Sequence, residues 1–229
     1  MPLARSTVAV ARPPIALPIR HRTPASWWIV LGLAASVTLY ALAYVLVGPA
    51  MYPPQLADSF RARPWGIYPH AFFGAVAMIL GPLQFRRDLL WRRRSLHRTL
   101  GKIYLISCLA VGSAGLYMAA YSFGGWITHL GFGLLAILLL TSSALAYAAI
   151  RRREILRHRA WMVRSYALLF AAVTLRLELP ILTFALGGFA TAYAIVSWLC
   201  WVPNLVWAGW YVRRSSAGEA PLVRELQGA

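Results

Sequence analysis

The chain has 229 residues, of which 60% are hydrophobic and only 13% are charged, and its formal net charge is +17. Soluble domains carry about 25% charged residues, so this composition excludes a soluble globular protein and indicates a membrane protein. A basic excess can mark a nucleic-acid-binding surface, but here its position along the chain follows membrane topology, and we expect no nucleic-acid partner.

Six apolar segments are long enough to cross a bilayer, which takes about 20 residues in a helix. They lie near residues 27–48, 66–85, 100–121, 125–150, 161–183 and 189–211. The sequence therefore predicts an all-α polytopic membrane protein with six transmembrane helices. The second to fifth helices are expected to form a four-helix core from two similar helix pairs. This divides the chain into a basic N-terminal tail, 1–26, a transmembrane domain, 27–211, and a C-terminal tail, 212–229.

The first apolar segment contains Ala41-Leu42-Ala43, which is typical of a signal-peptidase site. Apolar residues continue as far as Val47, however, and the segment is too long for the apolar part of a signal peptide. We therefore expect the first crossing to be retained as a membrane anchor.

Basic residues alternate from one connection to the next. They cluster in both tails and in the second and fourth connections, whereas the first connection has only Arg61 and Arg63 and the third and fifth have none. Lys and Arg in short loops stay on the cytoplasmic side of the membrane. We therefore predict a multi-pass protein of the cytoplasmic (inner) membrane with both termini in the cytoplasm, in contact with the lipid bilayer and its anionic lipids.

Four histidines lie in four consecutive apolar segments, and the two halves of the core resemble copies. His70-Ala-Phe-Phe-Gly and His129-Leu-Gly-Phe-Gly begin similar phrases, and each leads to an arginine cluster and a His-Arg pair, His97-Arg98 or His158-Arg159. In the predicted topology, His70 and His129 share a depth toward the outer leaflet, and the other two share a depth at the cytoplasmic side. Two sites are predicted, separated by most of the bilayer.

Histidine pairs favour haem over other metal centres. A porphyrin supplies four nitrogens and leaves two axial positions for the protein, whereas zinc needs about four protein ligands, or three with water. Di-iron carboxylate bundles need several glutamates, and the crossings contain one acid, Glu178. We predict up to two haem b groups. Small residues that follow the histidines at helical spacing, such as Gly74 and Gly101, would make room for a flat group or simply allow close helix packing.

Basic residues near the histidines are candidates to bind the anionic haem propionates. Arg98, Arg159 and Arg164 are placed near the cytoplasmic pair. The alternative for these residues is that they mark topology and extend toward the lipid headgroups.

Arg176 lies deeper in the fifth crossing, five helical turns or about 27 Å from His158 along the same face. We expect it to bind the outer haem, or an anionic or quinone-like electron donor, because an arginine inside a membrane needs a partner. Glu178 is two residues away, so the two side chains point to different faces and are not expected to pair directly.

Three motifs resemble those of a bacterial membrane family, the domain of unknown function 2306. They are His70 with Gly81-Pro-Leu-Gln-Phe85, then His97-Arg98-x-x-Gly101-Lys-x-Tyr104, then His158-Arg159-x-Trp161-Met162-x-Arg164-Ser165-Tyr166. The resemblance covers roughly residues 30–210 and brings no established reaction.

The chain is also similar, more loosely, to the di-haem cytochrome b(561)-type transmembrane reductases, whose second to fifth helices carry the axial histidines. This similarity implies that His70 pairs with His129 and His97 with His158, and it implies an electron-transfer role.

Two functions remain in view. The first is a b-type haem oxidoreductase that moves electrons within or across the membrane from a quinone or small-molecule donor. The second is a non-enzymatic module, such as a partner subunit or a carrier of small molecules or lipids, with structural histidines. An intramembrane hydrolase ranks last because no nucleophile stands in a recognisable setting. The sequence leaves open whether the chain forms a homo-oligomer.

Overall fold

A computed structural model of the chain describes residues 25–86 and 93–227, with side chains as far as residue 215. Every regular element in these ranges is a helix. In chain order they are α1 (Ala25–Leu46), the 3-10 helix η1 (Gly48–Met51), α2 (Ala57–Arg61), α3 (Pro64–Gln84), α5 (Arg94–Ala119), α6 (Trp126–Arg151), α7 (Ile155–Leu169), α8 (Ala171–Leu186), α9 (Phe189–Leu199) and α10 (Val202–Gln227).

Six helical stretches are long and apolar enough to cross a membrane, as predicted. The first four are single helices, whereas the fifth joins α7 to α8 at Phe170 and the sixth joins α9 to α10. Pro203 explains the second break, because proline lacks an N–H and its ring clashes with the carbonyl four residues earlier, where α9 ends at Leu199. Beyond the predicted end of the sixth crossing at residue 211, the chain stays helical to Gln227.

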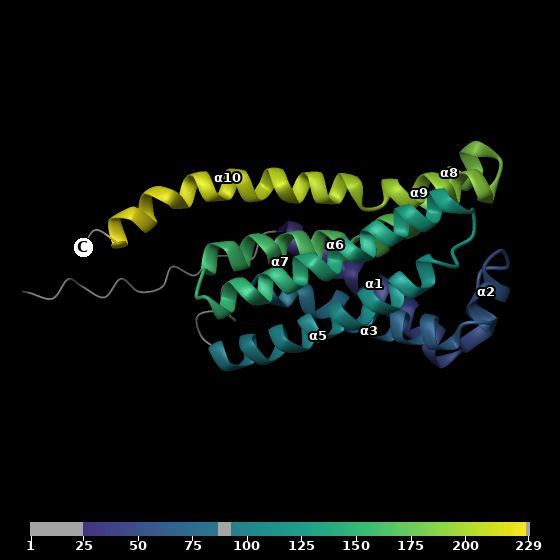
Figure 1. Cartoon of the computed structure of the whole chain (residues 1–229), viewed down its shortest axis with the longest axis horizontal. Coiled ribbons are helices and arrows are strands. Elements are labelled where there is room, and N and C mark those ends of the chain that lie inside the picture. The colour runs from purple at the N-terminus through teal and green to yellow at the C-terminus, as the bar shows by residue number, and fades with distance from the viewer. Residues whose placement is uncertain (1–24, 87–92, 228–229) are drawn as a thin grey trace, which may run out of the picture.

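The long helices lie roughly along one axis, with their connections at two ends (Figure 1). One end, here called the basic end, holds the end of α3, the start of α5, the α6–α7 connection and the second half of α10. Its described arginines include Arg86, Arg93, Arg94, Arg98, Arg151, Arg152, Arg153, Arg157, Arg159, Arg213 and Arg214. The opposite end holds η1, α2, the α5–α6 loop and the α8–α9 turn. The basic residues predicted for positions 1–24 and 87–92 lie outside the described residues.

Helix packing brings the second to fifth crossings together. α3 packs on α5, α5 on α6 and α6 on α7, and α7 also contacts α3. Outside these four helices, α1 packs against α3 and α8. In addition, α9 packs against α6 and α8. α10 packs mainly on α7 and lies at the edge of the molecule (Figure 1).

Close approach between helices depends on small residues. A Cβ on Gly131 would lie 2.8 Å from the backbone oxygen of Ser197, so α6 and α9 approach at this point because glycine has no side chain. At the basic end, the indole N–H of Trp27 donates to the carbonyl of Pro82 over 3.0 Å. That carbonyl belongs to the last turn of α3 and also accepts the backbone N–H of Phe85, so the indole bond fastens α1 to the end of α3.

Candidate functional site

His97 and His158 occupy equivalent positions at the basic end. Each is the fourth residue of its helix, α5 and α7 respectively. Seven residues further along each helix, the hydroxyl groups of Tyr104 and Ser165 are joined by a hydrogen bond of 3.0 Å, so α5 and α7 run side by side with the two histidines at the same level. The structure therefore places these two predicted partners at one level of two neighbouring helices.

The ring of His158 is oriented by a backbone carbonyl. Its Nδ1 lies 2.8 Å from the carbonyl oxygen of Ala146 on α6. A carbonyl only accepts hydrogen bonds, so Nδ1 carries a proton, and in the neutral ring this leaves the lone pair on Nε2. Metal-binding histidines usually have this second bond, because it fixes the tautomer and the ring orientation. The Nδ1 atom of His97 is buried and has no hydrogen-bond partner.

Gln84 is a buried polar side chain at the end of α3, where this helix packs against α5. It is 5% exposed, and its amide nitrogen has no hydrogen-bond partner. A Cβ on Gly101 would lie 3.3 Å from its amide oxygen, so Gln84 rests on the glycine one turn after His97. An unsatisfied donor in a buried position is uncommon and marks this region as a place where a ligand atom could accept a hydrogen bond.

The three sequence motifs meet just beyond these residues. The ring of Tyr166 covers Gly81 and lies 5.9 Å from the ring of Phe85, centroid to centroid. Tyr104 and Ser165 form a buried hydrogen bond of 3.0 Å between their hydroxyl groups. Residues of the three motifs, which are far apart in the sequence, therefore contact one another in the structure.

The other two histidines are held differently. The Nδ1–H of His70 points to the carbonyl of Val111 on α5, at 3.3 Å. In His129 it is Nε2–H that donates, to the carbonyl of Ser122 in the preceding loop, at 2.9 Å. The Nε2 atom of His129 is therefore engaged by its own loop, and only its Nδ1 is left to accept a bond.

His70 and His129 also differ in depth. A Cβ on Gly115 would touch both the ring of His70, at 3.3 Å, and Ala136 of α6, at 3.9 Å, so His70 is level with Ala136. Ala136 follows His129 by seven residues, about 10 Å along a helix. The predicted equal depth of these two histidines is therefore wrong, because His129 stays in the first turn of α6 where the loop carbonyl holds it.

The arginines predicted to lie near His97 and His158 point in different directions. Arg98 is exposed, and Arg159 lines a small hollow between α7 and α10. Arg164 stacks on Trp161 at 4.9 Å and donates to the carbonyl of Ala160. These side chains do not form one cluster around His97 and His158.

Arg176 and Glu178 point to different faces of α8, as their spacing predicts. Arg176 lies over the ring of Tyr40 on α1, with 4.9 Å between the guanidinium carbon and the ring centroid. Glu178 faces the other way and interacts with Cys200, which follows α9. No ion pair joins the two among the described side chains.

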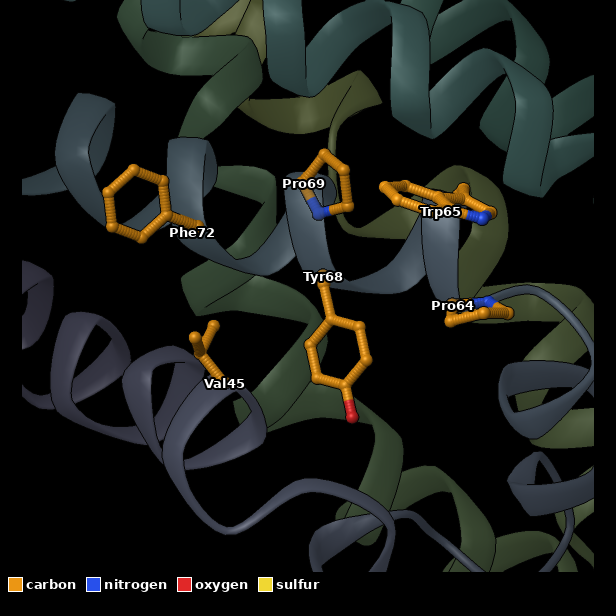
Figure 2. A pocket seen from close by; sticks show the side chains of 6 residues that line it. All are labelled: Val45, Pro64, Trp65, Tyr68, Pro69 and Phe72. Atoms are coloured by element: carbon orange, nitrogen blue, oxygen red, sulfur yellow. The ribbon is translucent and has the colours of Figure 1, made fainter.

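A hollow of about 390 Å³ opens between α1 and α3 near the opposite end (Figure 2). Its lining residues are Val45, Pro64, Trp65, Tyr68, Pro69 and Phe72. Tyr68 reaches from α3 toward α1, and the other side chains are apolar (Figure 2). His70 is directed to the other side of α3, toward α5, so this hollow is separate from the histidine sites.

The sequence does not reveal which side chains of neighbouring helices contact one another. Tyr40 and Tyr44, which flank Arg176, are indistinguishable in the sequence from tyrosines that anchor a helix at the membrane surface. Ser143 and Ser165, whose hydroxyl groups are 3.0 Å apart, carry no signal beyond small residues in apolar helices. Gln84, in contrast, could have been identified from the sequence, because it lies within a family motif and is the single amide side chain in an apolar segment.

In the described ranges, no group of three or more His, Cys, Asp or Glu side chains could hold a metal ion. Haem differs from such a metal site, because the porphyrin supplies four nitrogen ligands to the iron and the protein needs to supply only the two axial ligands. The paired histidines are thus compatible with haem ligation by donor type and number.

Six apolar helices around a core with few charges define a polytopic α-helical membrane protein. Within that class, the chain belongs to the family described as "Predicted membrane protein (DUF2306)", whose model matches residues 67–212. Comparison with curated proteins and with solved structures gives no significant match. The matched range contains all four membrane histidines, Gln84 and Arg176.

Proposed function

We propose that this protein transfers electrons in the membrane and binds a b-type haem through His97 and His158. The observation that carries the proposal is that these two histidines occupy the same position of α5 and α7, two helices that the hydrogen bond between Tyr104 and Ser165 holds side by side. The bond from His158 Nδ1–H to Ala146 supports it further, because it leaves Nε2 free to bind iron.

The residues around this pair would orient the group and hold it in place. Haem supplies one-electron chemistry when bound. The Ala146 carbonyl holds the His158 ring in one orientation and makes its Nε2 more basic. The buried amide of Gln84 has a donor to offer to a ligand oxygen at this end of the bundle. Arg98 is exposed beside His97 and favours anionic groups there.

A second haem between His70 and His129 extends the proposal. It requires His129 to release the Ser122 carbonyl, or to bind through Nδ1, and it requires the depth difference between the two rings to close. The site at His97 and His158 therefore has the stronger support. The electron donor that we propose is a quinone or another small molecule that reaches the bundle through the bilayer.

A non-redox membrane module is the second candidate, and a specific observation favours it. The small-residue faces predicted to make room for a flat group are partly filled by side chains, with Tyr166 over Gly81 and Leu140 over Gly112. Under this alternative, the histidines serve as hydrogen-bond donors that fix one helix against the next.

A visible difference spectrum separates the two candidates. The protein is expressed with ample haem, purified in detergent, and measured reduced with dithionite against air-oxidised. We expect the sharp reduced bands of six-coordinate haem b, lost in His158→Ala. His129→Ala serves as the matched control, because the residue occupies the same position of α6 but is bound to its own loop.

Retention of at least one full set of bands in His129→Ala, together with their loss in His158→Ala, supports haem at the His97 and His158 pair. Folded wild-type protein without these bands refutes haem binding and leaves the non-redox module. Folding is monitored by size-exclusion chromatography and circular dichroism for every variant.

A further inference from the structure

Arg176 is a cation inside the fifth crossing, far from the basic end. It lies ten residues before Leu186, where α8 ends, which is about 15 Å along the helix. Its guanidinium lies where α8 meets α1, over the ring of Tyr40. A charged group at such depth is costly unless it is paired or solvated.

No described carboxylate neutralises Arg176. In the part of the chain whose side chains are described, Asp58 pairs with Arg61 and Glu154 with Arg157. The third acid, Glu178, is two residues from Arg176 on α8 and so points to another face of the helix, and no ion pair joins it to Arg176 among these side chains. The positive charge of Arg176 is therefore left without a counter-ion among these side chains.

The hydrogen-bond donors of Arg176 are only partly used. One Nη donates to the carbonyl of Ala172 over 2.7 Å, while the buried Nε–H has no partner. The Nε–H and the neighbouring Nη form the edge of the guanidinium that binds carboxylate and phosphate with two parallel hydrogen bonds.

Two tyrosine hydroxyl groups and a histidine ring lie around this guanidinium. The hydroxyl groups of Tyr40 and Tyr44 are 3.2 Å apart, and only one of their two hydrogens is used between them, so the other is free to donate. His70 lies within electrostatic range of Arg176 from α3 and carries no negative charge to offset it. Tyr40 is 39% exposed, so the cluster opens toward the lipid-facing side of the molecule.

We propose that Arg176, with Tyr40 and Tyr44, forms a binding site for an oxyanion of the carboxylate or phosphate class. The anion accepts two hydrogen bonds from the free edge of Arg176 and a third from a tyrosine hydroxyl. The site stands on its own contacts and does not depend on haem binding. An anionic lipid headgroup and the head of a small amphiphilic anion both meet this chemistry.

The test is a set of ligand titrations of the full chain in neutral detergent micelles, read as the midpoint of thermal unfolding. The probes are dioleoylphosphatidylglycerol, with dioleoylphosphatidylcholine as its control, and sodium phosphate and sodium benzoate, with sodium chloride at equal ionic strength. A stabilising ligand raises the midpoint with a dependence on concentration that gives its affinity.

We expect at least one anionic probe to raise the midpoint of the wild-type protein above its control. Arg176→Gln should weaken that probe by about tenfold or more, because it removes a charged hydrogen-bond donor. Arg63→Gln is the matched control. Arg63 also stacks on a tyrosine, Tyr121, at 4.0 Å, but lies before α3 at the opposite end, and its loss should leave the affinity within about twofold.

Two further variants protect the test against misfolding of Arg176→Gln. Arg176→Lys keeps the charge but loses the two-donor edge, and Tyr40→Phe keeps the ring but loses the hydroxyl, so each should show an intermediate affinity. A response to phosphatidylglycerol alone identifies a lipid headgroup, and a response to phosphate or benzoate identifies a free anion. No response to any anionic probe, or equal responses in wild type and in the Arg176 variants, overturns the proposal.

Discussion

The contact between Gly81 and Tyr166 gives the sharpest prediction about the core. A Cβ built on Gly81 would lie 3.2 Å from Cζ of Tyr166 and closer still to two other ring atoms. The ring has little freedom to move away, because it packs against Phe85 and Phe170 and its hydroxyl donates to the Met78 carbonyl over 3.4 Å. Gly81→Ala must therefore displace an aromatic ring or separate α3 from α7.

The expected loss of stability follows from three contributions. Overpacking of a close-packed core costs about 1–3 kcal/mol, and loss of the Tyr166 hydrogen bond costs about 1 kcal/mol. Replacing glycine by alanine within a helix offsets about 0.5–1 kcal/mol of this. We expect Gly81→Ala to lower the free energy of unfolding by about 1–3 kcal/mol.

The assay is reversible unfolding in mixed micelles with increasing sodium dodecyl sulfate, followed by circular dichroism. Gly133→Ala is the control, because a Cβ there has nothing within 4 Å, and we expect it to be neutral or slightly stabilising. Combining Gly81→Ala with Tyr166→Leu should recover part of the loss, since neighbouring residues are not additive. Wild-type stability in Gly81→Ala would refute the reasoning.

Two further predictions concern buried hydrogen bonds. Ser165→Ala should lower the free energy of unfolding by about 1–3 kcal/mol, because its hydroxyl bonds those of Tyr104 and Ser143, each at 3.0 Å; an unchanged unfolding curve would contradict this. Trp27→Phe should cost about 1 kcal/mol by removing the indole bond to the end of α3, while Trp28→Phe, at a position 58% exposed, should cost little. Equal thermal midpoints for the two tryptophan variants would count against that bond.

The membrane architecture follows from the sequence because it depends on composition and length. A helix that crosses lipid must be apolar over about 20 residues, and this signal needs no knowledge of the neighbouring helices. The six crossings are confirmed on that basis. The interruption before Pro203 has an equally local cause, the missing N–H of proline.

The details of the histidine sites depend on contacts between distant segments. His129 is held by the Ser122 carbonyl because the loop folds back through Gly124 and Gly125, both at positive φ, and no periodicity in the sequence encodes that turn. For the same reason, matching phrases in the two halves did not ensure that His70 and His129 would share a depth. The repeat predicts which residues face the core but not how far one helix slides along another.

For Arg176 too, some properties follow from its own helix and others depend on the packing of distant helices. Its separation from Glu178 follows from helical geometry, because residues two apart lie on different faces. Its contact with Tyr40 follows from the packing of α1 against α8, two helices far apart in the chain. The sequence indicates that Arg176 needs an interaction partner inside the membrane. Only the fold identifies Tyr40 as the residue that it contacts.

Haem content per folded chain tests the central claim most directly. The purified wild-type protein, His97→Ala, His158→Ala and His129→Ala are each assayed for haem b as the pyridine haemochromogen, relative to protein that elutes as a folded species. We predict at least one haem per wild-type chain, a loss of that haem in both His97→Ala and His158→Ala, and its retention in His129→Ala. Folded wild-type protein that contains no haem, or a haem content per chain that is undiminished in both His97→Ala and His158→Ala, would contradict the account.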